Sequence, residues 1–297
     1  MKKKISFIVL IVAILIVSDA IVGAISRKLI VNAPDVGLNQ TNTLQALFHQ
    51  KADILILGSS RANHSFDSRI ITKETGLSCF NAGRDGMEIL YDLTVLRCYM
   101  KRYVPKIVVL DVNESMIDGS WAGTIKEINS CFGLSPIIDS TLEAHDSWQD
   151  RMKLHSNIYR YNKSWEWLLK AYMSTPKECL YGYFPMKEKN NATFHFIRDN
   201  KKLVPGKEDL VYLNQLISLC KENGVKIIIT YVPTLILNAE GAPSFLRKYC
   251  AQQHIRLMDY SENKKYYLHP EYFYDMTHLN EKGAEVFSND FASNLLR

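Results

Sequence analysis

A serine near the start of the chain and a histidine near its end have the neighbours of a catalytic pair. Ser60 follows the apolar run at residues 54–57 and one glycine, Gly58, while His278 stands three residues after Asp275. A carboxylate one turn away can accept the imidazole Nδ1 proton and leave Nε2 free to take a proton from a serine hydroxyl. These three side chains therefore predict nucleophilic catalysis by a serine, with a histidine as base and an aspartate as the group that orients it.

The residues that flank this pair predict the elements that position it. Four apolar residues bounded by a glycine are typical of a buried strand in a parallel sheet, and Gly58 allows the backbone to bend sharply. Open α/β sheets carry their chemistry at the carboxyl ends of strands, which is where Ser60 would stand. The last helix is predicted to begin near Asn280, a good N-cap, so His278 would lie just ahead of it.

Buried runs alternate with amphipathic segments through most of the chain. Strands are predicted at residues 54–57, 77–80, 107–110, 225–230 and 255–258, and helices at about 65–74, 89–100, 210–220, 243–252 and from 280 onward. Strands that alternate with helices imply a parallel sheet covered on both faces. The sequence therefore predicts the α/β class, as a three-layer sandwich with a central parallel sheet.

The N-terminus carries an apolar segment behind basic residues. Lys2–Lys4 precede an apolar stretch from Ile5 to Ile25, about long enough as a helix to cross a bilayer. Basic residues on this side favour a cytoplasmic N-terminus and an exported body. The alternative is a signal peptide cleaved near Asp19, a residue that is costly inside a membrane. Either reading predicts an extracytoplasmic body, periplasmic or at the cell surface, and we favour an uncleaved single-pass anchor.

The predicted organisation has three parts. Residues 1–28 form the anchor or signal segment, 29–50 a connector, and 51–297 the catalytic α/β domain. At about 117–207 the hydrophobic pattern loosens, aromatic residues such as Trp121 become frequent, and short helices are expected. We interpret this stretch as an insertion or lid whose aromatic side chains pack together, with a sugar-binding platform as the alternative.

Three segments resemble sequence blocks of the SGNH (GDSL-like) hydrolase and acyltransferase superfamily, in its membrane-anchored bacterial type. Residues 58–60 resemble the first block, with Ser59 where aspartate is usual. Residues 81–86 resemble the second block, and residues 275–278 match the fifth. The match covers about residues 50–115 and 205–297 and implies the flavodoxin-like sandwich of that superfamily.

The resemblance also implies roles for individual residues. Ser60 would be the nucleophile, His278 the base and Asp275 the orienting acid. The oxyanion hole would use the Ser60 N–H, the Gly86 N–H and the side chain of Asn113. The third block of the superfamily normally pairs a glycine-rich turn with its asparagine, and this chain offers Asn113 without the glycine.

Each of these residues has an alternative role. Ser60 could cap the following helix, Asn113 could brace the end of its strand, and Gly86 could be a turn residue that needs positive φ. Arg61 could bind a substrate anion or pair with a carboxylate. His64 is expected at the surface or as a helix cap.

Composition argues against several classes of function. The net charge is only +5, and no aromatic-interleaved basic patch stands out, so nucleic acid is not an expected partner. The six cysteines (Cys79, Cys98, Cys131, Cys179, Cys220, Cys250) include no CxxC pair. HExxH, the Walker loop and the GxSxG elbow are missing from the sequence. No metal site and no cofactor is therefore expected.

The resemblance implies a membrane-tethered serine esterase or O-acyltransferase. Anchored members of the superfamily often act on cell-surface polysaccharides, which implies an acylated glycan or another ester as substrate, acetyl as the favoured group, and a membrane-bound acyl donor protein as a candidate partner. One alternative is a non-catalytic module that binds glycan or a membrane acyltransferase. Another is a lipase-like esterase for long-chain esters.

Overall fold

The apolar run that precedes Ser60 forms a strand inside a five-stranded sheet, in a computed structural model that describes residues 2–120, 122–174, 181–187, 195–238 and 240–295. All four strand pairings in this sheet are parallel, and the strand order is β2-β1-β3-β5-β7. The strands are β1 (Ile54–Gly58), β2 (Cys79–Asn81), β3 (Ile107–Asp111), β5 (Lys226–Tyr231) and β7 (Arg256–Asp259). Each predicted strand is present, and β2 begins two residues later than expected.

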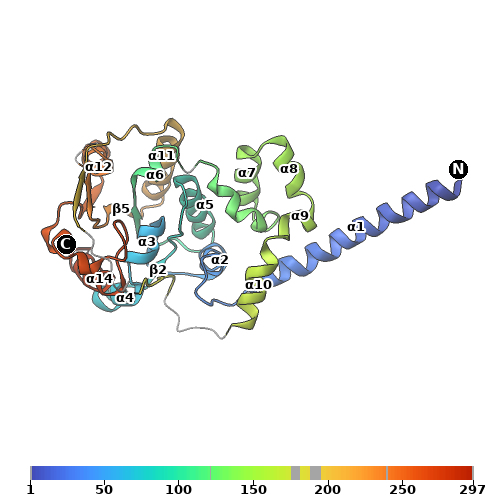
Figure 1. Cartoon of the computed structure of the whole chain (residues 1–297), viewed down its shortest axis with the longest axis horizontal. Coiled ribbons are helices and arrows are strands. Elements are labelled where there is room, and N and C mark those ends of the chain that lie inside the picture. Colours follow the sequence, from blue (N-terminus) through green and yellow to red (C-terminus); the bar gives the residue numbers. More distant parts are fainter. Residues whose placement is uncertain (1, 121, 175–180, 188–194, 239, 296–297) are drawn as a thin grey trace.

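Side chains of each strand alternate between two hydrophobic cores. On β1, Leu55 and Leu57 join the core on one face, and Ile54 and Ile56 join the core on the other. Helices α5 (Ile89–Met100), α11 (Lys207–Glu222) and α12 (Ala242–Gln253) cover the first face, and α4 (Ser68–Thr75) and α14 (Glu281–Leu295) cover the second (Figure 1). The predicted three-layer α/β sandwich is confirmed.

The strand order places a topological switch point beside Ser60. The chain runs from β1 outward to β2, then returns to place β3 on the other side of β1. The loops that follow β1 and β3 therefore leave the sheet in diverging directions, and a crevice forms at their carboxyl ends. Ser60 follows β1 and Asn113 follows β3, so both stand at this point.

The predicted helix at residues 65–74 corresponds to α4, and another helix that was not predicted precedes it. A short helix, α3 (Ser60–Ser65), begins at the serine itself, and α4 follows after a break. Asp67 causes the restart, because its side chain accepts a hydrogen bond from the Arg69 N–H and caps α4. Gly76 ends α4 in the left-handed conformation, as its position after the helix predicted.

Short helices make up most of the described part of the 117–207 stretch, as expected. They are η2 (Thr124–Cys131), α7 (Pro136–His145), α8 (Trp148–Leu154), α9 (Asn157–Tyr161) and α10 (Ser164–Met173), after α6 (Glu114–Ile117). The stretch returns to the body through β4 (Ile197–Asp199), which pairs in parallel with β6 (Ile236–Asn238) in a small sheet that was not predicted. Two residues named above, Trp121 and Cys179, lie outside the described part of the chain.

The connector is more helical than the one short helical piece expected near Leu44 to His49, which is confirmed. It contains α2 (Asn39–Leu44) and the π-helix η1 (Gln45–His49), and the first helix, α1 (Lys2–Val31), extends into it. Two short elements, α13 (Lys264–Tyr267) and η3 (Pro270–Tyr272), precede the segment with Asp275. No observation tests the domain boundaries, and they stay predictions.

Helix α1 projects away from the body along most of its length (Figure 1). Residues 4–31 have a mean hydropathy of 2.9 over their most apolar window, and none of that window is buried. Length and composition make α1 a candidate membrane span, and a signal sequence has the same properties.

Candidate active site

Gly58 makes the sharp turn that presents Ser60. Its φ is +134°, a region that side chains disfavour, and a Cβ on it would lie 2.7 Å from the Asp111 carbonyl oxygen. The next residue, Ser59, is the N-cap of α3, and Ser60 is the first residue of that helix. The end of β1 and the start of α3 therefore fix the Ser60 backbone from both sides.

A closed loop holds Asp275 and His278 ahead of α14. Phe273 and Leu279 form an antiparallel bridge across the base of this loop. Inside it, Asp275 Oδ1 accepts hydrogen bonds from the Thr277 N–H at 2.8 Å and the His278 N–H at 2.9 Å. The carboxylate is thus anchored to the backbone of the loop that carries the histidine.

The structure brings Ser60, His278 and Asp275 together across 218 residues of sequence. His278 Nε2 lies 2.8 Å from Ser60 Oγ, and Nδ1 lies 2.9 Å from Asp275 Oδ2. The His278 side chain is 19% exposed, so its ring is shielded while its contact with Ser60 stays near the surface. These distances suit transfer of the serine proton to the imidazole, with the ring held by the carboxylate.

The surroundings of Asp275 keep this carboxyl ionised. Burial raises its pKa, but the hydrogen bonds and charge of His278 and the N–H of Thr277 outweigh burial and hold the pKa well below the ordinary 3.8. An ionised Asp275 accepts a hydrogen bond from the Nδ1–H group of His278. The proton therefore stays on Nδ1, and the lone pair of Nε2 is directed at Ser60.

Asn113 and Gly86, the two expected oxyanion-hole residues besides Ser60, stand on segments that contact the Ser60 turn and α3. Asn113 donates from Nδ2 to Ser59 Oγ at 2.6 Å and accepts from the Met116 N–H at 3.1 Å, so it both reaches the Ser60 turn and caps α6. Gly86 has a φ of +70° and directly follows Asp85, which accepts a hydrogen bond from Asn63 of α3. The loop with Gly86 therefore lies against the helix that Ser60 begins.

His64 is buried beside the proposed base, so the expected surface or capping role is wrong. Its ring packs edge-on against the His278 ring, with centroids 5.7 Å apart. Its Nδ1 lies 2.6 Å from the Phe184 carbonyl oxygen, and its Nε2 lies 3.1 Å from Asp85 Oδ1. The position of His64 one turn after Ser60 on a helix was the signal that could have revealed it.

Asp85, which accepts from Asn63 and pairs with His64, was not identified from the sequence. Burial raises its pKa, but hydrogen bonding and charge from His64 and hydrogen bonds from Asn63 and Asn39 outweigh burial and lower the pKa to about 2. The resulting carboxylate links α3, the connector helix α2 and the loop with Gly86.

Arg61 pairs with a buried carboxylate, which is the second of its two expected roles. Its guanidinium lies 3.3 Å from Asp111 Oδ2 and 4.0 Å from the centre of the Tyr231 ring, and it is almost fully buried. Burial opposes its charge, but the attraction of Asp111 outweighs burial and raises the pKa of Arg61. This pair joins the helix after β1 to the end of β3 beneath the site.

Among the described residues, no group of three or more histidine, cysteine, aspartate or glutamate side chains could hold a metal ion. The five described cysteines are all free and buried.

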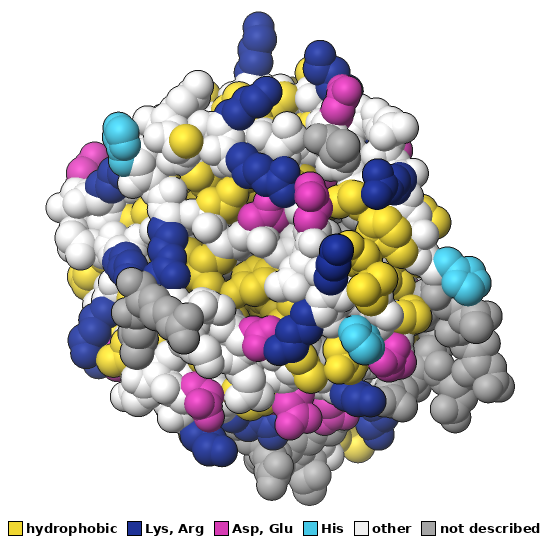
Figure 2. All heavy atoms as spheres, turned by 90° about the vertical axis from the view of Figure 1, so that its left-hand side faces the viewer, with side chains coloured by type: hydrophobic (Ala, Val, Ile, Leu, Met, Phe, Trp, Pro, Cys, Tyr) yellow, Lys and Arg dark blue, Asp and Glu magenta, His cyan; other side chains and the backbone are white. Residues whose placement is uncertain are grey.

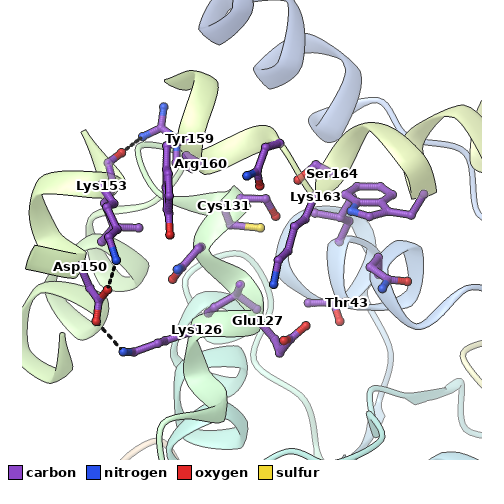
Figure 3. A pocket seen from close by; sticks show the side chains of 18 of the residues that line it. Thr43, Lys126, Glu127, Cys131, Asp150, Lys153, Tyr159, Arg160, Lys163 and Ser164 are labelled. Atoms are coloured by element: carbon purple, nitrogen blue, oxygen red, sulfur yellow. Dashed lines mark hydrogen bonds and ion pairs between the residues drawn. The ribbon is translucent and has the colours of Figure 1, made fainter. Parts of the chain in front are cut away.

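A cavity of about 550 Å³ lies elsewhere, between α2 and the helices η2, α8, α9 and α10 (Figure 3). Its lining includes Arg84, Lys126, Lys153, Arg160 and Lys163 against Glu127 and Asp150, and none of the three residues Ser60, His278 and Asp275. Lys126 and Lys153 both bind Asp150, at 2.8 and 3.1 Å, which neutralises part of this basic lining.

Three solved structures are similar to this chain. A protein described as lipolytic and of the G-D-S-L family, from Desulfitobacterium hafniense DCB-2, is 10% identical with a TM-score of 0.41, and the match covers 82% of this chain and 98% of that one. A protein described as an acylhydrolase, from Bacteroides fragilis NCTC 9343, is 14% identical with a TM-score of 0.38, over 90% and 93% of the two chains. A gut microbial diltiazem-metabolizing enzyme is 12% identical with a TM-score of 0.30, over 82% of this chain and 48% of that one.

A scan of protein-family models and a search of curated proteins found no match.

Proposed function

We propose that this chain is a membrane-tethered, extracytoplasmic serine enzyme that acts on acyl esters, as an esterase or an O-acyltransferase. The observation that carries the proposal is the contact of Ser60 Oγ with His278 Nε2 at 2.8 Å, while Asp275 holds Nδ1 at 2.9 Å. Its location at the switch point of a parallel sheet supports the same conclusion, because such crevices bind ligands.

In the first step, Ser60 Oγ attacks the carbonyl carbon of the ester as His278 Nε2 takes the hydroxyl proton. Asp275 stabilises the imidazolium that forms and stays ionised throughout. Negative charge develops on the carbonyl oxygen, where the N–H groups of Ser60 and Gly86 and the Asn113 amide would donate. Each such donor typically contributes about a hundred- to thousand-fold in rate.

In the next step, the C–O bond to the leaving alcohol breaks and His278 returns its proton to the alcohol oxygen. The acyl group stays on Ser60 as an ester. Water or a sugar hydroxyl then gives its proton to His278 Nε2 and attacks the acyl carbon. The bond between the acyl carbon and Ser60 Oγ breaks, and His278 returns the proton to Ser60 Oγ. Hydrolysis and transfer use the same residues and differ only in the acceptor.

We propose acylated glycans of the cell envelope, with acetyl as the acyl group, as the substrate. An apolar N-terminal helix would keep the domain close to a polymer made or displayed at the membrane. A membrane-bound acyl donor protein is the matching candidate partner for transfer.

Labelling with a fluorophosphonate tests the nucleophile. The full chain should react at one site, and Ser60→Ala should abolish labelling, whereas Ser140→Ala, at an exposed serine of α7, should label normally. A Ser60→Ala protein that still labels would contradict the assignment. An unlabelled, well-folded wild-type protein that binds glycan would favour the non-catalytic module instead.

Mass spectrometry identifies the substrate class. Surface glycan from cells that lack this chain should differ in acetyl content from wild-type glycan. A rise in acetylation indicates an esterase and a fall indicates a transferase. Unchanged glycan, together with hydrolysis of long-chain esters by the pure protein, would point to the lipase-like alternative.

A further inference from the structure

The body holds the one acidic residue of the apolar helix α1. Asp19 accepts hydrogen bonds from Ser156 Oγ at 3.1 Å, from the Asn157 backbone and side chain at 3.1 and 2.8 Å, and from the Ile158 N–H at 2.9 Å. All these donors lie at the start of α9. The contact with α9 is therefore made from within the apolar stretch of α1, and not from a residue that follows this stretch.

The length of α1 determines where this junction lies relative to a bilayer. The exposed apolar run from Ile5 to Val17 is about 13 residues, or ~20 Å of helix at 1.5 Å per residue. The hydrocarbon core of a bilayer is ~30 Å thick, which requires about 20 residues. Only the longer stretch from Ile5 to Ile25, about 21 residues and ~31 Å, matches this thickness. A span of that length places Asp19, six residues before Ile25, about 9 Å inside the edge of the hydrocarbon, and it takes the start of α9 to the same depth.

The insertion helices next to α1 expose many large apolar side chains. Among the described residues outside α1, eight of the fifteen exposed large hydrophobic side chains lie between residues 148 and 173, on α8, α9 and α10. Two of the eight are tyrosines, and one of them, Tyr172, donates from its hydroxyl to the Leu29 carbonyl of α1 at 2.9 Å. The other six are defined here as the α8–α10 surface: Trp148, Met152, Ile158, Trp165, Leu169 and Met173.

Helix α10 carries apolar side chains on its buried face and also on part of its exposed side. Ser164, Leu168 and Ala171 follow each other at helical spacing and are buried against the body. Trp165 and Leu169 are one turn apart on another face and point outward. The exposed side also carries Glu166 and Lys170, which pair with each other at 2.7 Å, so the outer side of α10 presents both apolar and charged side chains, as an interfacial helix does.

The chemistry of this region suits a lipid surface. Tryptophan and tyrosine concentrate at membrane interfaces, where their rings are in the headgroup layer, and basic residues accompany them near anionic lipid. Exposed basic side chains also lie on or beside α8–α10, at Arg151, Lys153, Lys163 and Lys170. The face of the molecule turned away from the projecting end of α1 shows hydrophobic side chains as well, with lysine, arginine, aspartate and glutamate side chains spread among them (Figure 2).

We propose that the α8–α10 surface lies in the interfacial layer of the bilayer that α1 crosses, so that the insertion seats the domain on the membrane. The proposal rests on α1 as a membrane anchor and on nothing in the catalytic assignment. This arrangement gives the insertion a role. It also explains why α9 binds Asp19, because an unpaired carboxylate at that depth of the bilayer would be costly. The domain is then held at a fixed height and orientation, so the substrate has to be presented close to the lipid surface.

Fluorescent labels on the full chain in lipid nanodiscs test the proposal. Single cysteines at Leu169, Leu268 and Ile11 carry an environment-sensitive dye, in a background with Cys179→Ser and with the five buried cysteines left in place. Leu169 and Leu268 form a matched pair, because both are leucines that are 62% exposed, one on the α8–α10 surface and one beside α13. The readout is quenching by spin-labelled lipids.

We expect the labels at Ile11 and Leu169 to lose at least about half of their emission, and the label at Leu268 to be nearly unaffected. A label at Leu169 that behaves like the one at Leu268, while Ile11 is quenched, would overturn the seated surface and leave α1 as a simple tether. A label at Ile11 that is not quenched would overturn both the anchor and the surface. Neither result depends on whether Ser60 is catalytic, since no activity is measured.

Discussion

Replacement of Asp275 by asparagine should remove activity by changing which nitrogen of His278 carries the proton. In the wild type, Oδ1 accepts from the backbone N–H groups of Thr277 and His278, and His278 Nδ1 lies 2.9 Å from Oδ2 and 3.0 Å from Oδ1. The two backbone donors will hold the asparagine carbonyl oxygen at the Oδ1 position. The amide NH2 then occupies the Oδ2 position and faces Nδ1 as a donor.

The expected loss in kcat follows from this replacement of an acceptor oxygen by a donor amide group. A donor at Oδ2 makes Nδ1 the acceptor, so the ring proton moves to Nε2, which faces Ser60 Oγ at 2.8 Å. Nε2 can then no longer take the serine proton. The loss in kcat for a wrong tautomer is about 10⁴-fold, which corresponds to about 5 kcal/mol in the activation barrier.

The assay is hydrolysis of p-nitrophenyl acetate by the full chain in detergent, with the rate of fluorophosphonate labelling as a second readout. Thr277→Val is the matched control. It removes the hydroxyl that lies 3.1 Å from Asp275 Oδ1 but leaves both backbone donors and the carboxylate, so activity should stay within about tenfold of wild type. An Asp275→Asn enzyme within tenfold of wild type would refute the tautomer argument.

Three further predictions concern the turn and the groups around it. Gly58→Ala should abolish fluorophosphonate labelling and lower the free energy of unfolding by more than about 2 kcal/mol. The reason is that the new Cβ would lie 2.7 Å from the Asp111 carbonyl oxygen, at a φ that side chains disfavour. A normal melting temperature would contradict this prediction. Arg61→Met should lower the free energy of unfolding, measured by chemical denaturation, by about 3–5 kcal/mol, because it leaves Asp111 buried without its ion-pair partner. Arg61→Lys should restore only part of this free energy, since lysine cannot form the same planar contacts. Asp85 has a pKa lowered from 3.8 to about 2 in the folded state, so its stabilisation is complete above pH 3.8 and is lost as the pH falls toward 2. The melting temperature of Asp85→Asn should therefore lie below wild type at pH 6 and converge with it near pH 2; an equal difference at both values would show that the charge of Asp85, paired with His64, is not responsible.

Local patterns predicted most of the sheet and its covering helices, because these elements depend on short-range signals. The run at residues 54–57 is long enough and apolar enough to be recognised as a buried strand, and Gly76 marks the end of α4 through its backbone freedom alone. Helix α3 was missed, since its residues show no apolar periodicity and its formation depends on contacts with β1, β3 and α14. The pair β4 and β6 was missed for a similar reason, because short, half-exposed strands carry little pattern until a partner pairs with them.

The candidate active site likewise contains residues that the sequence could identify and residues that it could not. Ser60, Asp275 and His278 were identifiable because their chemistry and spacing are written in two short segments. His64, Asp85 and the buried pair that includes Arg61 were not, because a histidine, an aspartate or an arginine in a polar segment gives no sign of its partner.

The sequence by itself determined the residue types that can perform acyl chemistry, the order of strands and helices, and an apolar N-terminal helix with one carboxylate in it. Only the tertiary structure decided that the hydroxyl meets the imidazole, that Arg61 faces inward to Asp111, and that Asp19 is held by α9. The physical reason is the distance along the sequence over which each kind of interaction acts. Backbone preferences and hydrophobic periodicity act over a few residues, whereas these contacts join segments 50 to 218 residues apart and form only when the sheet has packed.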